Sequence, residues 1–94
     1  MAWSIEYIKE AKNDLLKLDY SQRLQVLKAI EKVSCNPLSK YTTISKLAGY
    51  YKIKLIKLGI RVVYGLIRED KIMKIVVISV REDDAVYRLA DKRV

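Results

Sequence analysis

The stretch Tyr50–Tyr64, YYKIKLIKLGIRVVY, constrains the fold most, because charged and apolar side chains alternate along it. Successive side chains of a strand point to opposite faces of a sheet, so Tyr51 and Ile53 belong to one face and Lys52 and Lys54 to the other. This alternation is typical of a strand that packs one face against a core. The other face is then available as a working surface.

The turn that follows sets the register of a hairpin. Any loop of even length here pairs Leu55 with Ile60 and places Lys54 directly opposite Arg61, with Lys52 on the same face. Like charges this close destabilise a folded sheet, so their grouping indicates either a well-solvated edge or an anionic partner. We favour the anionic partner and keep the solvated edge as the alternative.

The net charge of +8 is concentrated around this hairpin. Residues 32–68 hold eight of the 19 cations and no acid, so the other 11 cations balance the 11 acids elsewhere in the chain. The eight are Lys32, Lys40, Lys46, Lys52, Lys54, Lys57, Arg61 and Arg68. A localised basic surface predicts a polyanionic partner, and nucleic acid is the first candidate. A basic face that is merely solvated is the alternative.

The length of 94 residues and the 51% hydrophobic content predict a single domain over residues 1–94 with one modest core. No apolar run approaches about 20 residues, and the first residues lack the pattern of a secretory signal, so we expect a cytoplasmic protein. The single cysteine, Cys35, cannot form an internal disulfide, and the chain contains no histidine. We therefore expect no metal site, no redox centre and no cofactor.

Hydrophobic periodicity predicts elements in the order βααβββα. Strand-like alternation covers residues 3–8, 50–57, 60–68 and 71–80, and helical spacing covers residues 8–18, 19–35 and a short segment from residue 82 onward. Asp19 and Gln22 have the spacing of a capping box, and Pro37 begins a loop over residues 37–46. The predicted fold class is α+β, with a two-helix layer packed on an antiparallel sheet and a short C-terminal helix.

The second hairpin is predicted to place Tyr64 opposite Ile75 and Val62 opposite Val77. Its first strand is apolar on both faces, which indicates that both faces are covered at least in part. We assign Tyr64 to the core and expect Trp3 to be a packing residue. The C-terminal helix is the candidate cover for the second face, through an apolar stripe of Val86, Leu89 and Ala90.

The candidate catalytic group consists of Lys52, Lys54, Arg61, Arg81 and Tyr87. Arg81 follows the last strand and Tyr87 lies in the last helix, so both can lean over the face of the hairpin cations. Grouped cations stabilise the negative charge that develops on a phosphate during transesterification, and arginine adds bidentate contacts. Neighbouring cations also help a lysine to lose its proton, so Lys52 or Lys54 is the candidate general base. Tyr87 can stack on a nucleobase or donate a hydrogen bond.

Each of these residues also has a purely structural interpretation. Lysines on an edge strand guard against aggregation, Arg81 can pair with a neighbouring acid, and Tyr87 can pack in the core. Arg61 is the hardest to explain in this way, because it lies in the middle of the sheet. A second group of cations is predicted to contact nucleic acid: Lys40, Lys46, Lys57, Arg68 and Lys74. Exposed loop lysines are common, so a plain surface role stays open for Lys40 and Lys46.

Five motifs occur in order along nearly the whole chain: KLDYSQRLQVLKAIEKVSCNP, LAGYYKIKL, GIRVVYGLI, VVISVRE and AVYRLADKR. Together they resemble the RelE toxins of type II toxin–antitoxin pairs, within the RelE/ParE superfamily. The resemblance implies a small βααβββα domain that enters the ribosomal A site and cleaves messenger RNA without metal, leaving a 2′,3′-cyclic phosphate and a 5′-hydroxyl. It also implies a RelB-like antitoxin partner, and a toxin–antitoxin complex that binds operator DNA through the antitoxin.

The resemblance also implies roles for individual residues. The YKIKL motif implies Lys52 and Lys54 as the base and phosphate-binding lysines, and the GIR motif implies Arg61 as a transition-state stabiliser. The match at Arg81 implies a phosphate contact or proton donor, and the match at Tyr87 implies a base-stacking tyrosine.

The chain departs from the family pattern at Ser79 and Val80, where RelE toxins commonly carry a glycine and another cation before the arginine. Relatives that use a Glu/His acid–base pair are not matched either, because the chain has no histidine. A smaller cation group predicts a poor nuclease by itself. This fits an enzyme that needs the ribosome to orient the 2′-hydroxyl for in-line attack.

Two other functions are compatible with this sequence. A ParE-type inhibitor poisons DNA gyrase without nuclease activity, although ParE-like chains typically lack the full set of lysines, arginines and tyrosine found here. An inactive module that regulates transcription only together with an antitoxin is the other possibility. In each case we expect an antitoxin segment, helical and partly acidic, to cover the hairpin face or to displace the last helix. Val63, Val76 and Ile78, which we expect to be exposed, are the candidate contacts.

Overall fold

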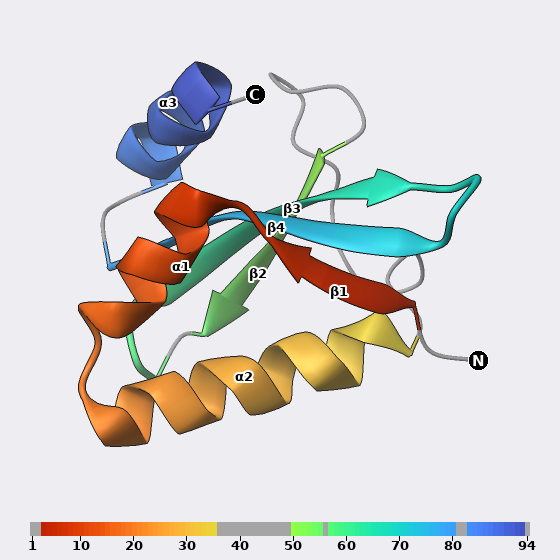
Figure 1. Cartoon of the computed structure of the whole chain (residues 1–94). Coiled ribbons are helices and arrows are strands. Elements are labelled where there is room, and N and C mark those ends of the chain that lie inside the picture. Colours follow the sequence, from red (N-terminus) through yellow and green to blue (C-terminus); the bar gives the residue numbers. More distant parts are fainter. Residues whose placement is uncertain (1–2, 36–49, 56, 81–82, 94) are drawn as a thin grey trace.

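The computed structural model describes residues 3–35, 50–55, 57–80 and 83–93, with only the backbone at residues 83, 84 and 87 (Figure 1). Its elements are β1 (Ser4–Tyr7), α1 (Lys9–Leu16), α2 (Tyr20–Ser34), β2 (Tyr50–Leu55), β3 (Ile60–Ile67), β4 (Ile72–Ser79) and α3 (Asp83–Arg93). This order confirms the predicted βααβββα arrangement. The predicted loop of residues 37–46 lies outside the described residues. None of the helices described is long and apolar enough to cross a membrane.

Helix α2 begins with the capping box that the sequence predicts. The Asp19 carboxylate accepts a hydrogen bond from the Gln22 backbone N–H at 2.8 Å, and the Gln22 side-chain oxygen accepts one from the Asp19 backbone N–H at 3.3 Å. Capping in this way gives partners to N–H groups near the helix start that have none within the helix. Val26, Ile30 and Val33 then follow at helical spacing and are buried in the core. The cap therefore fixes both the start of α2 and the face that it turns toward the sheet.

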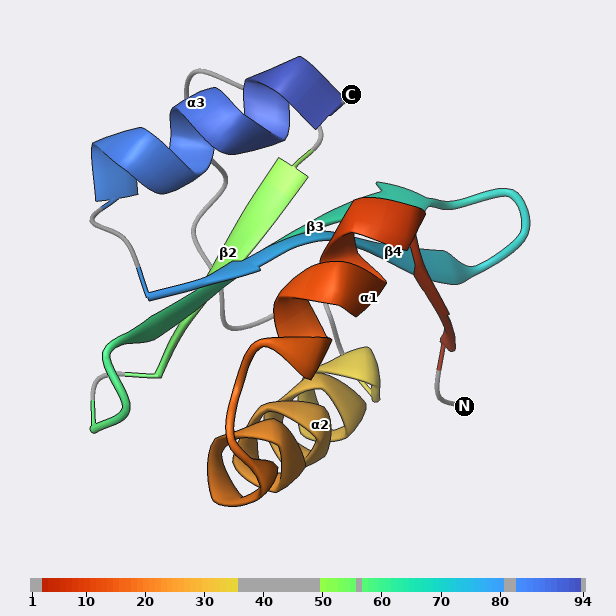
Figure 2. The same ribbon diagram turned by 60° about the vertical axis from the view of Figure 1, so that its left-hand side comes forward.

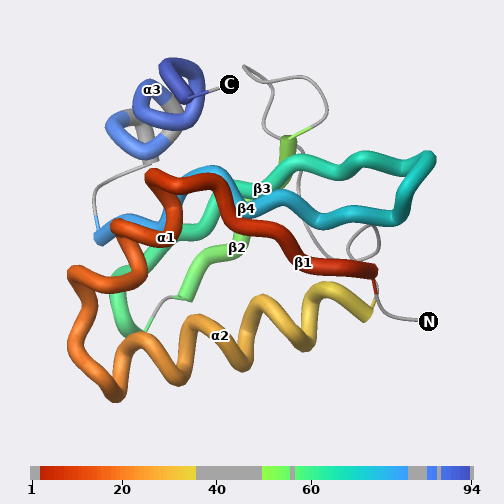
Figure 3. Tube along the Cα trace, viewed as in Figure 1, coloured from red at the N-terminus to blue at the C-terminus, as the bar shows by residue number. Residues whose placement is uncertain are grey.

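The four strands form one sheet in the order β1-β4-β3-β2. β2, β3 and β4 are successive antiparallel neighbours, whereas β1 pairs in parallel with the outer edge of β4. The chain runs from β1 directly into α1, which packs along β4 (Figure 3). Figure 2 shows α2 and α3 on opposite sides of the sheet. The sheet therefore has one face toward the α1–α2 layer and one face toward α3.

The larger core lies between the sheet and the α1–α2 layer. Tyr64 is fully buried in it, as predicted, and its ring stacks on that of Tyr51 with centroids 5.6 Å apart and 16° between the planes. Trp3 packs against the margin of this core. The buried members are Ala11, Val26, Ile30, Val33, Tyr51, Ile53, Ile60, Val62, Tyr64, Met73, Ile75 and Ile78.

A smaller apolar cluster lies beneath α3. Its buried members are Val63, Val76 and Val77 of the sheet and Val86 and Ala90 of α3. Helix α3 therefore covers part of the second face of the sheet, as the sequence predicts. We call these five residues the valine cluster.

A β-bulge in β4 changes the register of the second hairpin. Tyr64 pairs with Ile75 as predicted, but Val63 pairs with Val77, so Val76 is an extra residue without a partner position in β3. A bulge of this kind bends the strand and rotates the side chains that follow it. It brings two consecutive valines of β4 into the valine cluster.

The bulge makes two of the sequence predictions wrong. Val62 faces Ile78 instead of Val77, because the pairing is shifted by one residue beyond the bulge. Ile78 is only 2% exposed and belongs to the larger core, since the same shift turns it to the other face. Val63 and Val76 were also expected to be exposed, but α3 covers them. None of the three is therefore an exposed contact for a partner in this conformation.

Candidate functional site

The hairpin cations lie on the sheet face that α3 only partly covers. Lys54 pairs directly with Arg61, which confirms the predicted register, and Lys52 pairs with Val63 two residues earlier in β2. Lys54 is exposed, whereas Lys52 and Arg61 are half-buried. We call Lys52, Lys54 and Arg61 the cation cluster. Two neighbouring strands hold it, so its spacing depends on sheet hydrogen bonds and not on a loop.

The bulge adds a hydroxyl to the row that contains Arg61. Ser79 of β4 is the partner of Arg61, so Lys54, Arg61 and Ser79 lie side by side across three strands. Without the bulge, the continuous register would have placed the aliphatic side chain of Ile78 beside Arg61. In the family pattern Ser79 takes the place of a glycine, and its position in the sequence predicts no role for its hydroxyl. The structure shows that it extends the polar row.

Helix α3 forms one border of the site. Val86 and Ala90 pack over the sheet in the valine cluster, and the backbone of Tyr87 lies in the same helix. The Tyr87 side chain lies outside the described part of the structure, as does the whole of Arg81. Both residues therefore stay predictions for the site. The predicted contacts Lys40 and Lys46 lie outside the described residues as well.

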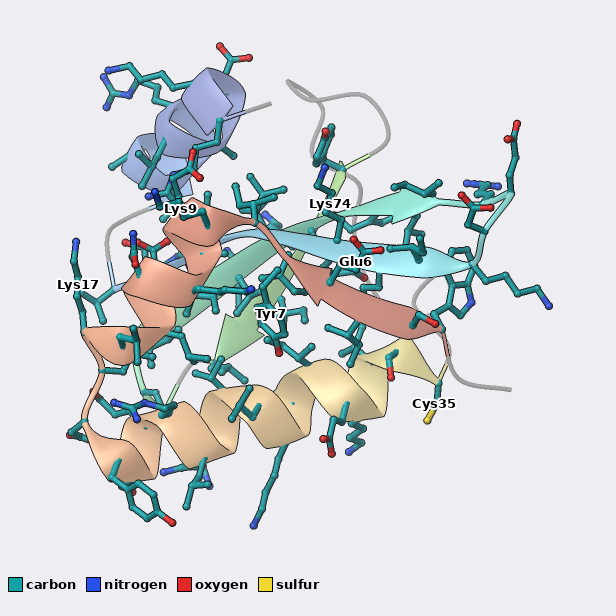
Figure 4. All side chains as sticks on the ribbon, viewed as in Figure 1. Glu6, Tyr7, Lys9, Lys17, Cys35 and Lys74 are labelled. Carbon is teal, nitrogen blue, oxygen red and sulfur yellow. The ribbon has the colours of Figure 1, made fainter. Side chains whose placement is uncertain are left out.

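The structure also places two of the other predicted cations, Lys57 and Lys74. Lys57 is exposed in the turn after β2, beside a hollow of about 300 Å³ that is also lined by Lys54 and by Gln25 of α2, so this hollow lies toward the α2 side of the sheet. Lys74 lies on the cluster's face of β4, paired with Gly65 on one side and with Glu6 of β1 on the other. The side chains of Lys74 and Glu6 are labelled in Figure 4. The position of Glu6 gives Lys74 a neighbouring opposite charge.

Arg68 is not part of the cation cluster. It follows β3 at the end of the strand far from Arg61, and its Nη2 donates a hydrogen bond to the Tyr51 hydroxyl at 3.3 Å. Tyr51 belongs to the larger core, on the opposite face of the sheet. The structure therefore separates Arg68 from the predicted catalytic cations.

An ion pair that the sequence analysis missed joins α1 to α3. Arg93 Nη1 lies 2.6 Å from Asp14 Oδ2, and Arg93 Nη2 donates to Asp14 Oδ1 at 3.3 Å. The same guanidinium donates to the Val76 carbonyl oxygen at 3.0 Å, and the carboxylate accepts from the Ile78 backbone N–H at 3.2 Å. Pairing between β1 and β4 ends at Ile75, so these backbone groups lie beyond the neighbouring strand. The ion pair takes the place of that strand and holds α3 at the bulge.

A signal for this ion pair is present in the sequence. Asp14 falls on the apolar stripe of α1, together with Ala11, Leu15 and Leu18. A charged side chain on an apolar stripe indicates a buried partner, because an unpaired buried charge is very costly. The identity of the partner cannot be read from spacing, since Arg93 lies 79 positions later.

The arrangement suits a phosphodiester. Three cations on one face can hold a phosphate and stabilise the additional charge of its transition state, and arginine can contact two oxygens at once. Among the residues described, no group of three or more His, Cys, Asp and Glu side chains could hold a metal ion. The row of Lys54, Arg61 and Ser79 offers ammonium, guanidinium and hydroxyl groups.

Two curated relatives match the chain along its whole length. It is 32% identical over 93 residues to a RelE-like toxin protein of Escherichia coli, covering 99% of this chain and 98% of that protein. It is 30% identical over 94 residues to the mRNA interferase toxin RelE of E. coli K12, covering 100% of this chain and 99% of that protein. No family model matches the chain.

Solved structures agree with these relatives. The free E. coli toxin RelE, carrying two arginine-to-alanine substitutions, matches with a TM-score of 0.87 at 29% identity, covering 100% of this chain and 99% of that chain. The toxin in the intact E. coli RelBE toxin–antitoxin complex matches with a TM-score of 0.79 at 26% identity, covering 86% of this chain and 99% of that chain. By sequence and by fold, the chain belongs to the RelE family of toxins.

Proposed function

We propose that this RelE-family toxin is a ribosome-dependent endoribonuclease that cleaves messenger RNA in the ribosomal A site and so inhibits translation. Relatives 30% identical to the chain are named mRNA interferases. The observation that carries the proposal is the pairing of Lys54 with Arg61, with Lys52 on the same face. Such a group matches a phosphate that gains negative charge in its transition state.

The proposed reaction is a transesterification within the RNA. The 2′-oxygen of one nucleotide attacks the adjacent phosphorus, and the bond to the 5′-oxygen of the next nucleotide breaks. The products are a 2′,3′-cyclic phosphate and a 5′-hydroxyl. Lys52 or Lys54 takes the proton of the 2′-hydroxyl, while Arg61 and the other lysine contact the phosphate oxygens. No metal is needed for these steps, and the ribosome supplies the in-line orientation of the RNA.

The remaining predicted residues complete the proposal. Arg81 contacts the phosphate or donates a proton to the leaving oxygen, and Tyr87 stacks on a base, as the family resemblance implies. Lys57, which is exposed three residues after Lys54, is a further contact with the RNA backbone. The other cations, Lys40, Lys46, Arg68 and Lys74, serve as contacts with ribosomal RNA.

The proposal includes an antitoxin partner of the RelB type. Solved relatives include RelE in complex with a RelB peptide and the intact RelBE complex. For this chain we propose a partly acidic antitoxin segment that covers the cation cluster or displaces α3. In the second case, the segment would bind Val63, Val76 and Val77, the three sheet residues of the valine cluster that α3 now covers. The complex would bind operator DNA through the antitoxin.

The test uses ribosomes programmed with a defined messenger RNA, in the presence of EDTA. Wild-type protein is expected to cut in the A-site codon and to leave cyclic phosphate and 5′-hydroxyl ends. Lys54→Ala should lower the cleavage rate by about tenfold or more, as expected for loss of a charged hydrogen bond. Lys28→Ala is the matched control, because Lys28 is also an exposed lysine but lies on α2, on the other side of the sheet.

Two outcomes would contradict the proposal. Equal cleavage by Lys54→Ala and Lys28→Ala would show that the cation cluster is not part of the active site. Gyrase-dependent DNA breaks with intact messenger RNA would instead support an inhibitor of the ParE type.

A further inference from the structure

Gly65 occupies an unfavourable place for a glycine, in the middle of the central strand β3. A glycine there costs backbone entropy and leaves no side chain to pack, so it usually marks the close approach of another group. That group is the ring of Tyr50, the residue opposite Gly65 in β2. A Cβ atom on Gly65 would lie 2.8 Å from Cε2, 3.2 Å from Cδ2 and 3.3 Å from Cζ of this ring. The ring therefore fills the space that a side chain at position 65 would take.

Tyr50 lies on the same face as the cation cluster. It precedes Lys52 by two residues in β2, so their Cα atoms are about 7 Å apart, given the rise of a strand. Gly65 pairs on its other side with Lys74, so a lysine stands beyond the ring as well. Tyr50 packs against the margin of the valine cluster and remains partly exposed. The Tyr50 ring thus packs on the sheet between Lys52 and Lys74, and part of its surface is exposed to solvent.

We propose that Tyr50 is a second aromatic contact for the RNA and stacks on the base next to the phosphate that the cation cluster holds. Single-stranded RNA is commonly held by cations along its backbone and by aromatic rings against its bases. Because the Tyr50 ring already packs against Gly65, it loses little further conformational freedom when RNA binds, which favours affinity. This inference rests on the proposed function and adds a binding residue outside the predicted catalytic group.

The first test compares Tyr50→Phe and Tyr50→Leu with wild type in single-turnover cleavage of A-site messenger RNA over a range of protein concentrations. Phe keeps the aromatic ring and should act like wild type. Leu keeps an apolar contact with Gly65 but cannot stack, so we expect about a tenfold weaker apparent affinity, within the range measured for single stacking contacts. The midpoint of thermal unfolding should stay close to that of wild type for both variants. Gly65→Ala places a Cβ atom against the Tyr50 ring and displaces it, so this variant should also weaken affinity for RNA. It replaces Tyr50→Leu in the test if that variant does not fold.

The second test identifies the stacked base. Each base of the A-site codon and its neighbours is replaced in turn by an abasic residue, and wild type is compared with Tyr50→Leu on each RNA. When the stacked base is the one removed, wild type should bind the RNA no more tightly than Tyr50→Leu, because the missing base and the missing ring abolish the same contact. When any other base is removed, wild type should still bind more tightly. Equal affinity of wild type and Tyr50→Leu, or an advantage that survives at every abasic position, overturns the inference and leaves the proposed function intact. Absence of cleavage by wild type overturns the proposed function, and the inference with it.

Discussion

The two faces of the sheet differ in how they are covered. On one face, α1 and α2 bury a continuous core that includes Ile30 and Tyr64. On the other face, where α3 lies (Figure 2), the described side chains of α3 cover Val63, Val76 and Val77, and Lys54 is exposed. The Arg93–Asp14 ion pair supplements the few apolar contacts of α3. We propose that one face mainly stabilises the fold, while the other binds RNA and a partner.

The largest effect on stability is expected from Asp14→Ala. This change leaves the Arg93 guanidinium, only 14% exposed, without its carboxylate and leaves the Ile78 N–H without its acceptor. We expect the free energy of unfolding to fall by about 3 kcal/mol, as for other broken buried ion pairs. Urea unfolding measures the change. Asp91→Ala, at an exposed acid of α3, is the control, and an equal small loss in both variants would contradict a role for the ion pair.

A matched pair of valines tests the two covers directly. Val26 on α2 and Val86 on α3 are both 0% exposed, so the Val→Ala change removes the same atoms from each core. Val26→Ala should lower the free energy of unfolding by about 2 kcal/mol, because the large core cannot collapse around the cavity. Val86→Ala should lower it less and should instead speed hydrogen exchange of the α3 amides, because α3 can open locally. Equal losses of stability, with unchanged exchange in α3, would show that both covers unfold as one unit.

Lys71 allows stability to be changed without touching either cover. It lies in the turn between β3 and β4 with a φ of 53°, a left-handed conformation that costs a non-glycine residue energy. Lys71→Gly should raise the free energy of unfolding by about 1 kcal/mol, with messenger RNA cleavage unchanged. Lys71→Ala removes the same charge but keeps a Cβ atom, so it should bring no such gain. Equal stabilities of the two variants would show that the backbone conformation at this turn is not strained.

The smallest effect concerns Tyr7, which lies between the sheet and α2 (Figure 4). Burial raises the pKa of Tyr7 above its usual value of 10.0, and the Glu31 carboxylate raises it further. The folded protein therefore favours the neutral phenol, and this contribution to stability is complete below about pH 10 and is lost as pH rises through the folded pKa. The free energy of unfolding of wild type should then fall relative to that of Tyr7→Phe at alkaline pH. A difference that stays constant up to about pH 11 would contradict this pKa shift.

Features specified by local spacing could be predicted from the sequence. The Lys54–Arg61 pair follows from the short turn after β2, and the start of α2 follows from the Asp19 capping box. The bulge at Val76 could not be predicted, because it lies within a run of similar aliphatic residues that fits either register. Strict alternation therefore assigned Ile78 to the wrong face.

Contacts between distant segments account for the rest. Arg93 has the position of an ordinary basic residue at a helix C-terminus, and only the fold brings it to Asp14. The position of α3 over the sheet also depends on contacts between distant segments. The sequence therefore could not show that α3 covers Val63. For the catalytic group, the cation cluster could be placed from the hairpin register, whereas Ser79 joined its row through the bulge.

The proposed division of the sheet into a stabilising face and an RNA-cleaving face is tested most directly at Arg61. Cleavage of A-site messenger RNA and the free energy of unfolding are measured together for Arg61→Ala. Cleavage should fall by about a hundredfold or more, equivalent to roughly 3 kcal/mol of transition-state stabilisation, while stability stays within about 0.5 kcal/mol of wild type. Cleavage at the wild-type rate, or a loss of cleavage matched by an equal loss of stability, would contradict this division.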